Sequence, residues 1–328
     1  MTTAKPLISI VSPCFNEEDN IHELCRRIFE QADRLINYDF ELIFVDNAST
    51  DNTQKIIKDI ARIDRRVKLI VNNRNFGHIR SPMHGYFQAR GDAVIAMVSD
   101  LQDPPELIEQ LVRKWAEGYK VAICRKPTSK ENSIINTIRR VYYKAIGKIS
   151  EVALIPDFYG FGIYDRTVID SIKSLGDPYP YFRGLISELG YNYATIEFDQ
   201  PRRHRGITKN NFYSLYDTAM LGLTSHSKVP LRMATMSGFV LSFISLLIAL
   251  GYGVAKLLLW NNFSLGMAPL VVGLFFFGSV QLFFIGLLGE YIGAIHTQVM
   301  KRPLVVERER VNFDAPAATS GTASDSPG

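Results

Sequence analysis

Two long apolar segments in the C-terminal third most constrain how this chain can fold. Residues 233–259 contain a single charged side chain, Lys256, and residues 268–295 contain a single one, Glu290. Each segment is longer than the roughly 20 apolar residues with which a helix crosses a bilayer. The sequence therefore predicts a membrane hairpin of two helices. An ionisable group within a span is costly, so Glu290 is either a functional group or a helix-packing contact near the end of the span.

Basic residues flank this hairpin and predict its orientation. They precede the first segment and follow the second, whereas the connecting residues 260–267 contain none. By the positive-inside rule both termini and the N-terminal part are expected in the cytoplasm, in a multi-pass protein of the cell membrane. The same cluster could also bind an anionic headgroup or phosphate. Its members are Arg202, Arg203, Arg205, Lys209, Lys228 and Arg232 before the hairpin and Lys301, Arg302, Arg308 and Arg310 after it.

The start of the chain and its cysteines agree with a cytoplasmic location. Residues 1–6 lead into a short apolar run at 7–11 and then into polar residues, which is not the pattern of a signal peptide. Cys14, Cys25 and Cys124 are odd in number and lack the spacing of metal ligands. Reduced thiols without a special role are expected.

The polar part of the chain alternates between strand and helix patterns. Short apolar runs occur at 7–11, 42–45, 67–71, 93–98 and 121–124, and helical spacing occurs at 21–35, 51–63, 79–89 and 106–115. This order predicts an α/β domain over residues 1–210, with a mostly parallel sheet covered by helices. An amphipathic helix is expected at 211–230, lying in the membrane interface or packing in the core, and the tail 301–328 is expected to end in disorder.

The loops that follow the predicted strands are rich in Asp, Asn and Gly. In parallel sheets ligands bind at the carboxyl ends of the strands, so these loops are the expected site. Asp46 lies at the tip of a strand, where its carboxylate could accept hydrogen bonds from a base or ribose. Ser49 or Thr50 is expected to cap the next helix. Neither G-x-G-x-x-G nor G-x-x-x-x-G-K-[ST] occurs, which argues against a dinucleotide enzyme and a P-loop ATPase.

Several motifs together resemble one known family. They are Pro13…Asn16-Glu17, Val45-Asp46…Ser49-Thr50-Asp51, Asn75-x-Gly77 and Asp100-Leu101-Gln102-Asp103-Pro104-Pro105-Glu106, followed by the two apolar segments. This combination resembles the inverting family 2 glycosyltransferases with a GT-A (Rossmann-like) fold. More narrowly, it is similar to polyisoprenyl-phosphate glycosyltransferases of the GtrB type, relatives of dolichol-phosphate mannose synthase. The similarity extends from about residue 7 to about residue 303.

The resemblance implies a reaction and a set of site residues. Such enzymes move a hexose, commonly glucose from UDP-glucose, onto undecaprenyl or another polyprenyl phosphate with the help of Mg²⁺ or Mn²⁺. By this resemblance Asp100 and Gln102 hold the metal, and Asp100 counts as catalytic. A carboxylate and an amide two residues apart at a strand end also suit a hard cation that keeps substrate phosphates in its shell. The nucleotide-sugar site would comprise Pro13, Phe15, Glu17, Asp46, Asn75 and Ser99.

One position departs from the family pattern. The family usually has an acidic residue two positions before the one at Asp100, and here that position is Val98. Asp103, water or the donor phosphates could fill the vacancy, and metal dependence could be weaker. Alternatively, Asp103 is simply the N-cap of a helix that begins at Pro104.

The resemblance also places the acceptor. Asp157, within Ile155-Pro156-Asp157-Phe158-Tyr159-Gly160, corresponds to the family's candidate general base. A phosphate monoester is already largely dianionic at neutral pH, because its second pKa is about 6, so Asp157 could instead orient the acceptor or stabilise charge at the anomeric carbon. A phosphate near acidic residues needs cations. The candidates are Arg125, Arg183, Arg203 and Lys209.

Alternatives remain at this level. The donor could be GDP-mannose, UDP-GlcNAc or a UDP-amino sugar, and Val98 leaves room for a non-catalytic protein that binds nucleotide sugars. A processive polysaccharide synthase would need more spans and a Q-x-x-R-W motif, which neither Trp115 nor Trp260 provides. The resemblance further implies a flippase and a downstream membrane glycosyltransferase as partners, a homo-oligomer, no nucleic acid, and a role in glycosylation of the cell envelope.

Overall fold

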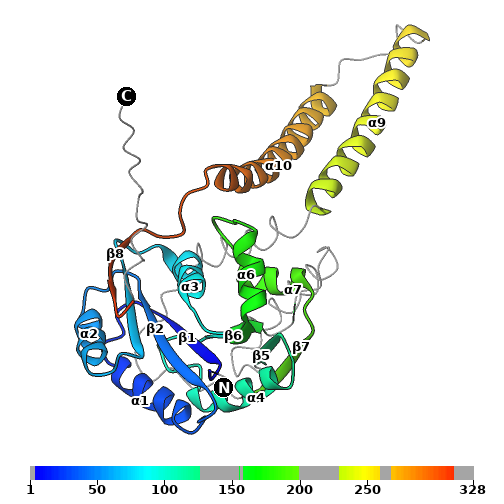
Figure 1. The fold of residues 1–328 in the computed structure, drawn as a ribbon. Coiled ribbons are helices and arrows are strands. Elements are labelled where there is room, and N and C mark those ends of the chain that lie inside the picture. The colour runs from blue at the N-terminus through cyan, green and yellow to red at the C-terminus, as the bar shows by residue number, and fades with distance from the viewer. Residues whose placement is uncertain (1–3, 126–154, 156–157, 199–228, 259–266, 314–328) are drawn as a thin grey trace, which may run out of the picture.

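The computed structural model describes residues 4–125, 155, 158–198, 229–258 and 267–313, and its centre is one mixed sheet (Figure 1). The strands lie in the order β7-β5-β6-β4-β1-β2-β3-β8. β1, β2, β3 and β4 are parallel neighbours, whereas β6 is antiparallel to β4 and β5, and β8 is antiparallel to β3. The strands are β1 Leu7–Cys14, β2 Asp39–Asp46, β3 Val67–Asn72, β4 Ala93–Ala96, β5 Val121–Arg125, β6 Phe158–Asp165, β7 Tyr193–Glu197 and β8 Glu307–Val311.

Helices cover both faces of this sheet, because each of its faces is apolar. One buried cluster joins the sheet to α1, α2 and α4, and a second joins it to α3, α6 and α7. Central strands such as β2, whose residues 40–46 are all buried, are covered on both sides, as expected for parallel strands. The helices are α1 Ile21–Ala32, α2 Thr53–Ile63, α3 Gly77–Gln88, α4 Ile108–Ala116, α6 Arg166–Ser174 and α7 Phe182–Leu189, with a short 3₁₀ turn, η1, at Pro105–Leu107.

The elements predicted from the sequence as far as residue 124 are confirmed. All five strands and four helices occur. β1 and β2 are longer than the apolar runs, because polar residues such as Ser12 and Glu41 are also buried in the sheet, whereas β4 ends at Ala96, two residues before the predicted run 93–98 does. Cys14, Cys25 and Cys124 are free and buried. The mostly parallel sheet is therefore present, with β6 and β8 as its antiparallel strands within the described residues.

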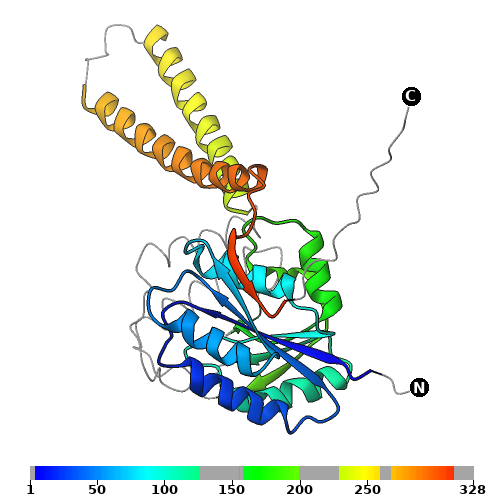
Figure 2. The same ribbon diagram turned by 60° about the vertical axis from the view of Figure 1, so that its left-hand side comes forward.

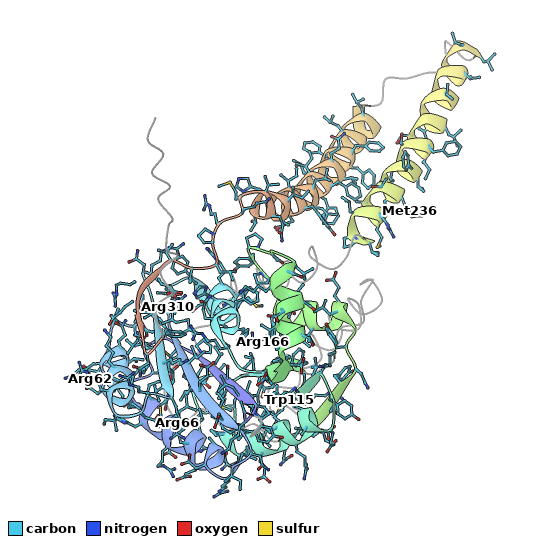
Figure 3. The ribbon with its side chains drawn as sticks, in the orientation of Figure 1. Arg62, Arg66, Trp115, Arg166, Met236 and Arg310 are labelled. Atoms are coloured by element: carbon cyan, nitrogen blue, oxygen red, sulfur yellow. The ribbon has the colours of Figure 1, made fainter. Side chains whose placement is uncertain are left out.

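Two long helices, α9 Val229–Leu258 and α10 Met267–Val299, project away from the sheet and its helices (Figure 2). Their described apolar side chains are largely exposed, as at Phe243 and Leu274, and Figure 3 shows such side chains, including Met236, pointing outward. Among the described residues one segment, Gly273–Val299, is long and apolar enough to cross a membrane. The expected pair of spans is therefore not confirmed.

The chain returns to the sheet after α10. β8 pairs with the free edge of β3, and Lys58 of α2 forms an ion pair with Glu309 at 2.6 Å. Just beyond β8, Asn312 Nδ2 donates to the carbonyls of Ala61 and Val67, at 2.7 and 2.8 Å. The segment that follows α10, which the sequence placed in a tail, thus supplies the edge strand of the sheet (Figure 1).

Candidate functional site

The four adjacent parallel strands β4, β1, β2 and β3 end at one edge of the sheet. Their registers align Cys14 with Asp46 and Asp46 with Val71. The loops that follow these strands contain most of the site residues predicted from the sequence. β5 runs in the same direction as β4, so Arg125 at its end lies at this edge as well.

The loops after β1 and β2 are joined by hydrogen bonds. Asn16 N donates to Ser49 Oγ at 2.9 Å, Thr50 N donates to Asn16 Oδ1 at 2.8 Å, and Glu17 N donates to Thr53 Oγ1 at 2.8 Å. Asn16 has a positive φ of 57°, a conformation that Asn tolerates better than most residues. The expected helix cap at Ser49 or Thr50 is wrong, because α2 has Asn52 at its N-cap position and Ser49 Oγ bonds the neighbouring loop instead.

Asn47 joins the loop after β2 to the loop after β3. Its Nδ2 donates to Asn75 Oδ1 at 2.9 Å and to Gly77 O at 3.2 Å. Its Oδ1 accepts from Phe76 N at 2.8 Å and from Asn72 Nδ2 at 3.1 Å. Sequence reasoning gave Asn47 no role. Its position directly after Asp46 at a buried strand end was the available signal.

Asp46 lies beneath the surface of this edge. It is fully buried, and its Oδ1 accepts from Ser49 N at 3.0 Å and from Gln54 Nε2 at 2.6 Å. Burial raises the pKa of Asp46 above its ordinary value, although the bonds from Ser49 and Gln54 oppose this shift. In this state the carboxylate organises its own loop. Contact with a base or ribose stays a prediction.

The loop after β4 presents Asp100 and Gln102. Asp100 Oδ1 accepts from Gln102 N at 3.1 Å, which closes a tight turn around Leu101 at a φ of 63°. Ser99 binds this loop to β1, because its Oγ donates to Pro13 O at 3.0 Å and lies 2.7 Å from Ser12 Oγ. Asp100 and Gln102 are partly exposed at the same edge as Pro13, Phe15 and Glu17.

Asp103 is not a helix cap. The N-cap position of η1 is Pro104, and the Asp103 carboxylate turns inward, where it accepts from Val98 N at 2.9 Å and from Tyr159 OH at 3.2 Å. It is 1% exposed, and burial raises its pKa to about 7. Asp103 therefore holds the loop after β4 against β6 from inside the protein. That orientation does not fill the position left by Val98.

The donor set at this edge fits a hard divalent cation that takes most of its ligands from outside the protein. Within the described residues no group of three or more His, Cys, Asp or Glu side chains could hold a metal ion. Asp100 and Gln102 offer one carboxylate and one amide from the same turn. Mg²⁺ bound at nucleotide sites commonly has one or two protein carboxylates and completes its shell with water and phosphate oxygens.

Two of the predicted acceptor residues are described. Arg125 ends β5, and the Arg183 guanidinium at the start of α7 lies 5.2 Å from the centre of the Tyr181 ring. Asp157, Arg203 and Lys209 lie outside the described residues, as does nearly all of the predicted helix at 211–230.

Comparison with known families decides the class of protein. Residues 9–172 match Glycosyl transferase family 2, and this segment runs from β1 into α6. The chain belongs to glycosyl transferase family 2. The mostly parallel sheet with its polar loops after β1, β2 and β4 is accordingly a GT-A fold, and this family 2 protein is a glycosyltransferase.

Relatives resemble this family 2 chain over nearly its whole length. An uncharacterized glycosyltransferase of Synechocystis is 36% identical over 90% of this chain and 93% of the relative. The prophage-derived bactoprenol glucosyl transferase of Shigella flexneri is 34% identical over 90% of this chain and 96% of that protein. The uncharacterized glycosyltransferase YkcC of Bacillus subtilis is 33% identical over 93% of this chain and 94% of YkcC.

A solved structure is more distant. Glucosyl-3-phosphoglycerate synthase of Mycobacterium tuberculosis, in complex with Mn²⁺, UDP and phosphoglyceric acid, has a TM-score of 0.47 and 19% identity. The match covers 67% of this chain and 77% of the synthase. Similarity at that level assigns no activity to the family 2 chain.

Proposed function

We propose that this glycosyltransferase moves a hexosyl group, glucose in the first instance, from a UDP-sugar to a polyprenyl phosphate at the cytoplasmic face of a membrane. The observation that carries this proposal is the 34% identity to a bactoprenol glucosyl transferase over 90% of this chain and 96% of that protein. The aligned length is too great for the family 2 domain alone. The aligned segment therefore includes α9 and α10. In this proposal α9 and α10 anchor the protein in the membrane.

In the proposed reaction an oxygen of the acceptor phosphate attacks the anomeric carbon of the sugar. A bond forms between the phosphate oxygen and the anomeric carbon as the bond from that carbon to the UDP oxygen breaks. UDP leaves with the electron pair of the broken bond. The configuration at the anomeric carbon is inverted. The acceptor needs no general base, because a phosphate monoester is largely dianionic at neutral pH.

The residues at the strand ends would position the donor. Pro13, Phe15 and Glu17 would line the nucleotide pocket with Asn75, and Asp46 and Ser99 would hold the loops that form it. Asp100 and Gln102 would hold the Mg²⁺ or Mn²⁺ ion, which supplies positive charge against the diphosphate as it leaves. Arg125 and Arg183, with Asp157, Arg203 and Lys209, would meet the acceptor.

The test is a panel of nucleotide sugars offered to the purified full chain with a polyprenyl phosphate. We expect a sugar-phosphate lipid from UDP-glucose and at least a tenfold lower rate from GDP-mannose and UDP-GlcNAc. Chelation by EDTA should abolish the product, and added Mg²⁺ should restore it. Transfer to a water-soluble alcohol at the same rate would contradict the lipid acceptor, and release of free sugar alone would make the protein a hydrolase.

Substitution of Asn47 by Ala tests the donor loops. The change removes the acceptor of Phe76 N and one of the two acceptors of the fully buried Asn72 Nδ2, which keeps Ser81 Oγ, and it releases Asn75. Because Asn47 positions these groups and does not itself react, we expect KM for the UDP-sugar to rise about tenfold while kcat falls less, a loss of about 1.4 kcal/mol of binding. Asn37→Ala, at an exposed turn before β2, is the control. An unchanged KM for the Asn47 variant would contradict this role.

A further inference from the structure

Three arginines gather where α10 leads back to the sheet. Arg74 belongs to the loop after β3, Arg80 belongs to α3, and Arg302 lies three residues after the end of α10. Arg80 Nη2 donates to the carbonyl of Pro303 at 2.5 Å, so the side chain of Arg80 reaches the residue next to Arg302. In Figure 1 the segment between α10 and β8 passes next to α3, which agrees with this contact.

One aromatic ring holds two of these guanidinium groups. The Cζ atom of Arg74 lies 4.1 Å from the centre of the Phe76 ring, and that of Arg80 lies 5.2 Å from it. Such cation–π contacts attract each guanidinium to the ring and restrict its orientation. Phe76 therefore brings two like charges together at the start of α3.

No carboxylate of the described residues forms an ion pair with this cluster. Arginines elsewhere on the domain, such as Arg26, Arg27 and Arg66, form ion pairs with carboxylates. Within the described ranges, Arg74 and Arg80 donate to backbone carbonyls, those of Asn75 and Pro303, and neither they nor Arg302 has a carboxylate partner.

Arg80 contributes a buried N–H group to this cluster. Its Nε is buried and has no hydrogen-bond acceptor in the part of the chain that the structure describes. Burial, followed by the charges of Arg74 and Arg302, lowers the pKa of Arg80 below its ordinary value. A buried N–H of a charged group that lacks an acceptor lowers the stability of the folded protein. An anion that accepts from Arg80 Nε would remove this cost and would also reduce the repulsion between the three guanidinium groups.

We propose that Arg74, Arg80 and Arg302 form a site for the phosphate group of a membrane lipid. Guanidinium groups bind phosphate through paired N–H donors, and the N-terminus of α3, at Gly77, adds the favourable end of a helix dipole. Arg302 and Pro303, which Arg80 contacts, follow the end of α10 by three and four residues. Lipid phosphates are found at that level if α10 spans the membrane, as proposed above. The lipid is a phospholipid of the bilayer or the polyprenyl phosphate acceptor, and both present the same group.

The test measures thermal unfolding of the detergent-purified full chain while lipid is added. A ligand that binds the folded state alone stabilises it by RT ln(1 + L/Kd), where L is the ligand concentration, so the rise of the melting temperature with ligand concentration reports Kd. Phosphatidylglycerol, a polyprenyl phosphate and inorganic phosphate are added separately, and diacylglycerol serves as the lipid without phosphate. We expect one of the two phosphate lipids to stabilise the protein, and its apparent Kd to rise at least tenfold in Arg74→Gln/Arg80→Gln.

Arg62→Gln is the control for Arg74→Gln, because each removes one arginine charge, and Arg62 lies on α2, on the side of the domain away from α10 (Figure 3). The single variant Arg74→Gln is included because it is expected to fold normally: Arg74 is exposed and makes few contacts with the rest of the domain. Stabilisation by phosphatidylglycerol assigns the site to bilayer lipid, and stabilisation by the polyprenyl phosphate alone assigns it to the acceptor. The proposal is overturned if inorganic phosphate acts as well as either lipid, if neither lipid stabilises the wild type, or if the arginine variants respond as Arg62→Gln does. These outcomes do not depend on transferase activity, so failure here leaves the proposed reaction intact.

Discussion

Replacing Asp100 by Ala should lower kcat for sugar transfer by about a thousandfold, the upper range for loss of one preorganised electrostatic group. Asp100 and Gln102 share one turn after β4, and Asp100 is the partly exposed carboxylate of that turn. Asp103 cannot replace it, because its carboxylate is buried and bonded to Val98 N and Tyr159 OH. The measurement is steady-state transfer from UDP-glucose to a polyprenyl phosphate over a range of Mg²⁺ concentrations.

Two controls separate loss of charge from loss of structure. Asp59→Ala removes an exposed carboxylate of α2 whose partner is Arg62, and we expect it to keep wild-type activity. Asp100→Asn keeps the acceptor that closes the turn and should be nearly as inactive as Asp100→Ala. If Asp100→Asn and Asp100→Ala both kept more than half of the activity, Asp100 would not hold the metal.

The largest loss of stability is expected for Glu41→Leu. Glu41 is buried in β2, where its carboxylate forms an ion pair with Lys68 of β3 at 2.6 Å and accepts from Ser9 Oγ and, at 3.0 Å, from Arg90 N. Leucine removes the acceptor that these three donors share. Breaking such a buried pair by removal of one partner costs about 3 kcal/mol, which urea unfolding in detergent should detect.

The pH dependence distinguishes this carboxylate from a surface one. Burial raises the pKa of Glu41, whereas the hydrogen bonds from Lys68, Ser9 and Arg90 N together lower it by more than burial raises it. In the folded protein the pKa of Glu41 therefore lies below its ordinary value. Its contribution is complete above the unfolded-state pKa of about 4.3 and is lost as the pH falls through the folded-state value. The difference between wild type and Glu41→Leu should therefore shrink below about pH 4. Asp59→Asn, at an exposed pair, should cost less than about 1 kcal/mol at any pH. A cost that small for Glu41→Leu at pH 7 would contradict the argument.

The sequence predicts the first half of the domain well for a physical reason. Strands β1 to β5 are buried on both faces and read as apolar runs, and the helices between them have one apolar stripe. Since parallel strands share one carboxyl edge, the polar loops of Asp46 and Asp100 could be expected to meet before any coordinates were known.

The rest depends on information that periodicity does not contain. Asp46 is oriented by the bonds that it accepts from Ser49 N and Gln54 Nε2. Asp103 is oriented by the bonds that it accepts from Val98 N and Tyr159 OH. Asn47 resembles any polar loop residue until its four bonds are seen. β8, with the alternating charges of Glu307-Arg308-Glu309-Arg310, reads as a solvated tail, because an edge strand needs little apolar surface.

The position of β8 in the chain has a consequence for how the protein is made. A ribosome synthesises β3 about 240 residues before β8, since Ile70 pairs with Arg310, and all of α9 and α10 lie in between. Until translation has passed both helices, the outer backbone groups of β3 have no partner, and a nascent domain with such an open edge is prone to pair with other chains. Completion of the sheet therefore has to wait until both apolar helices have been synthesised.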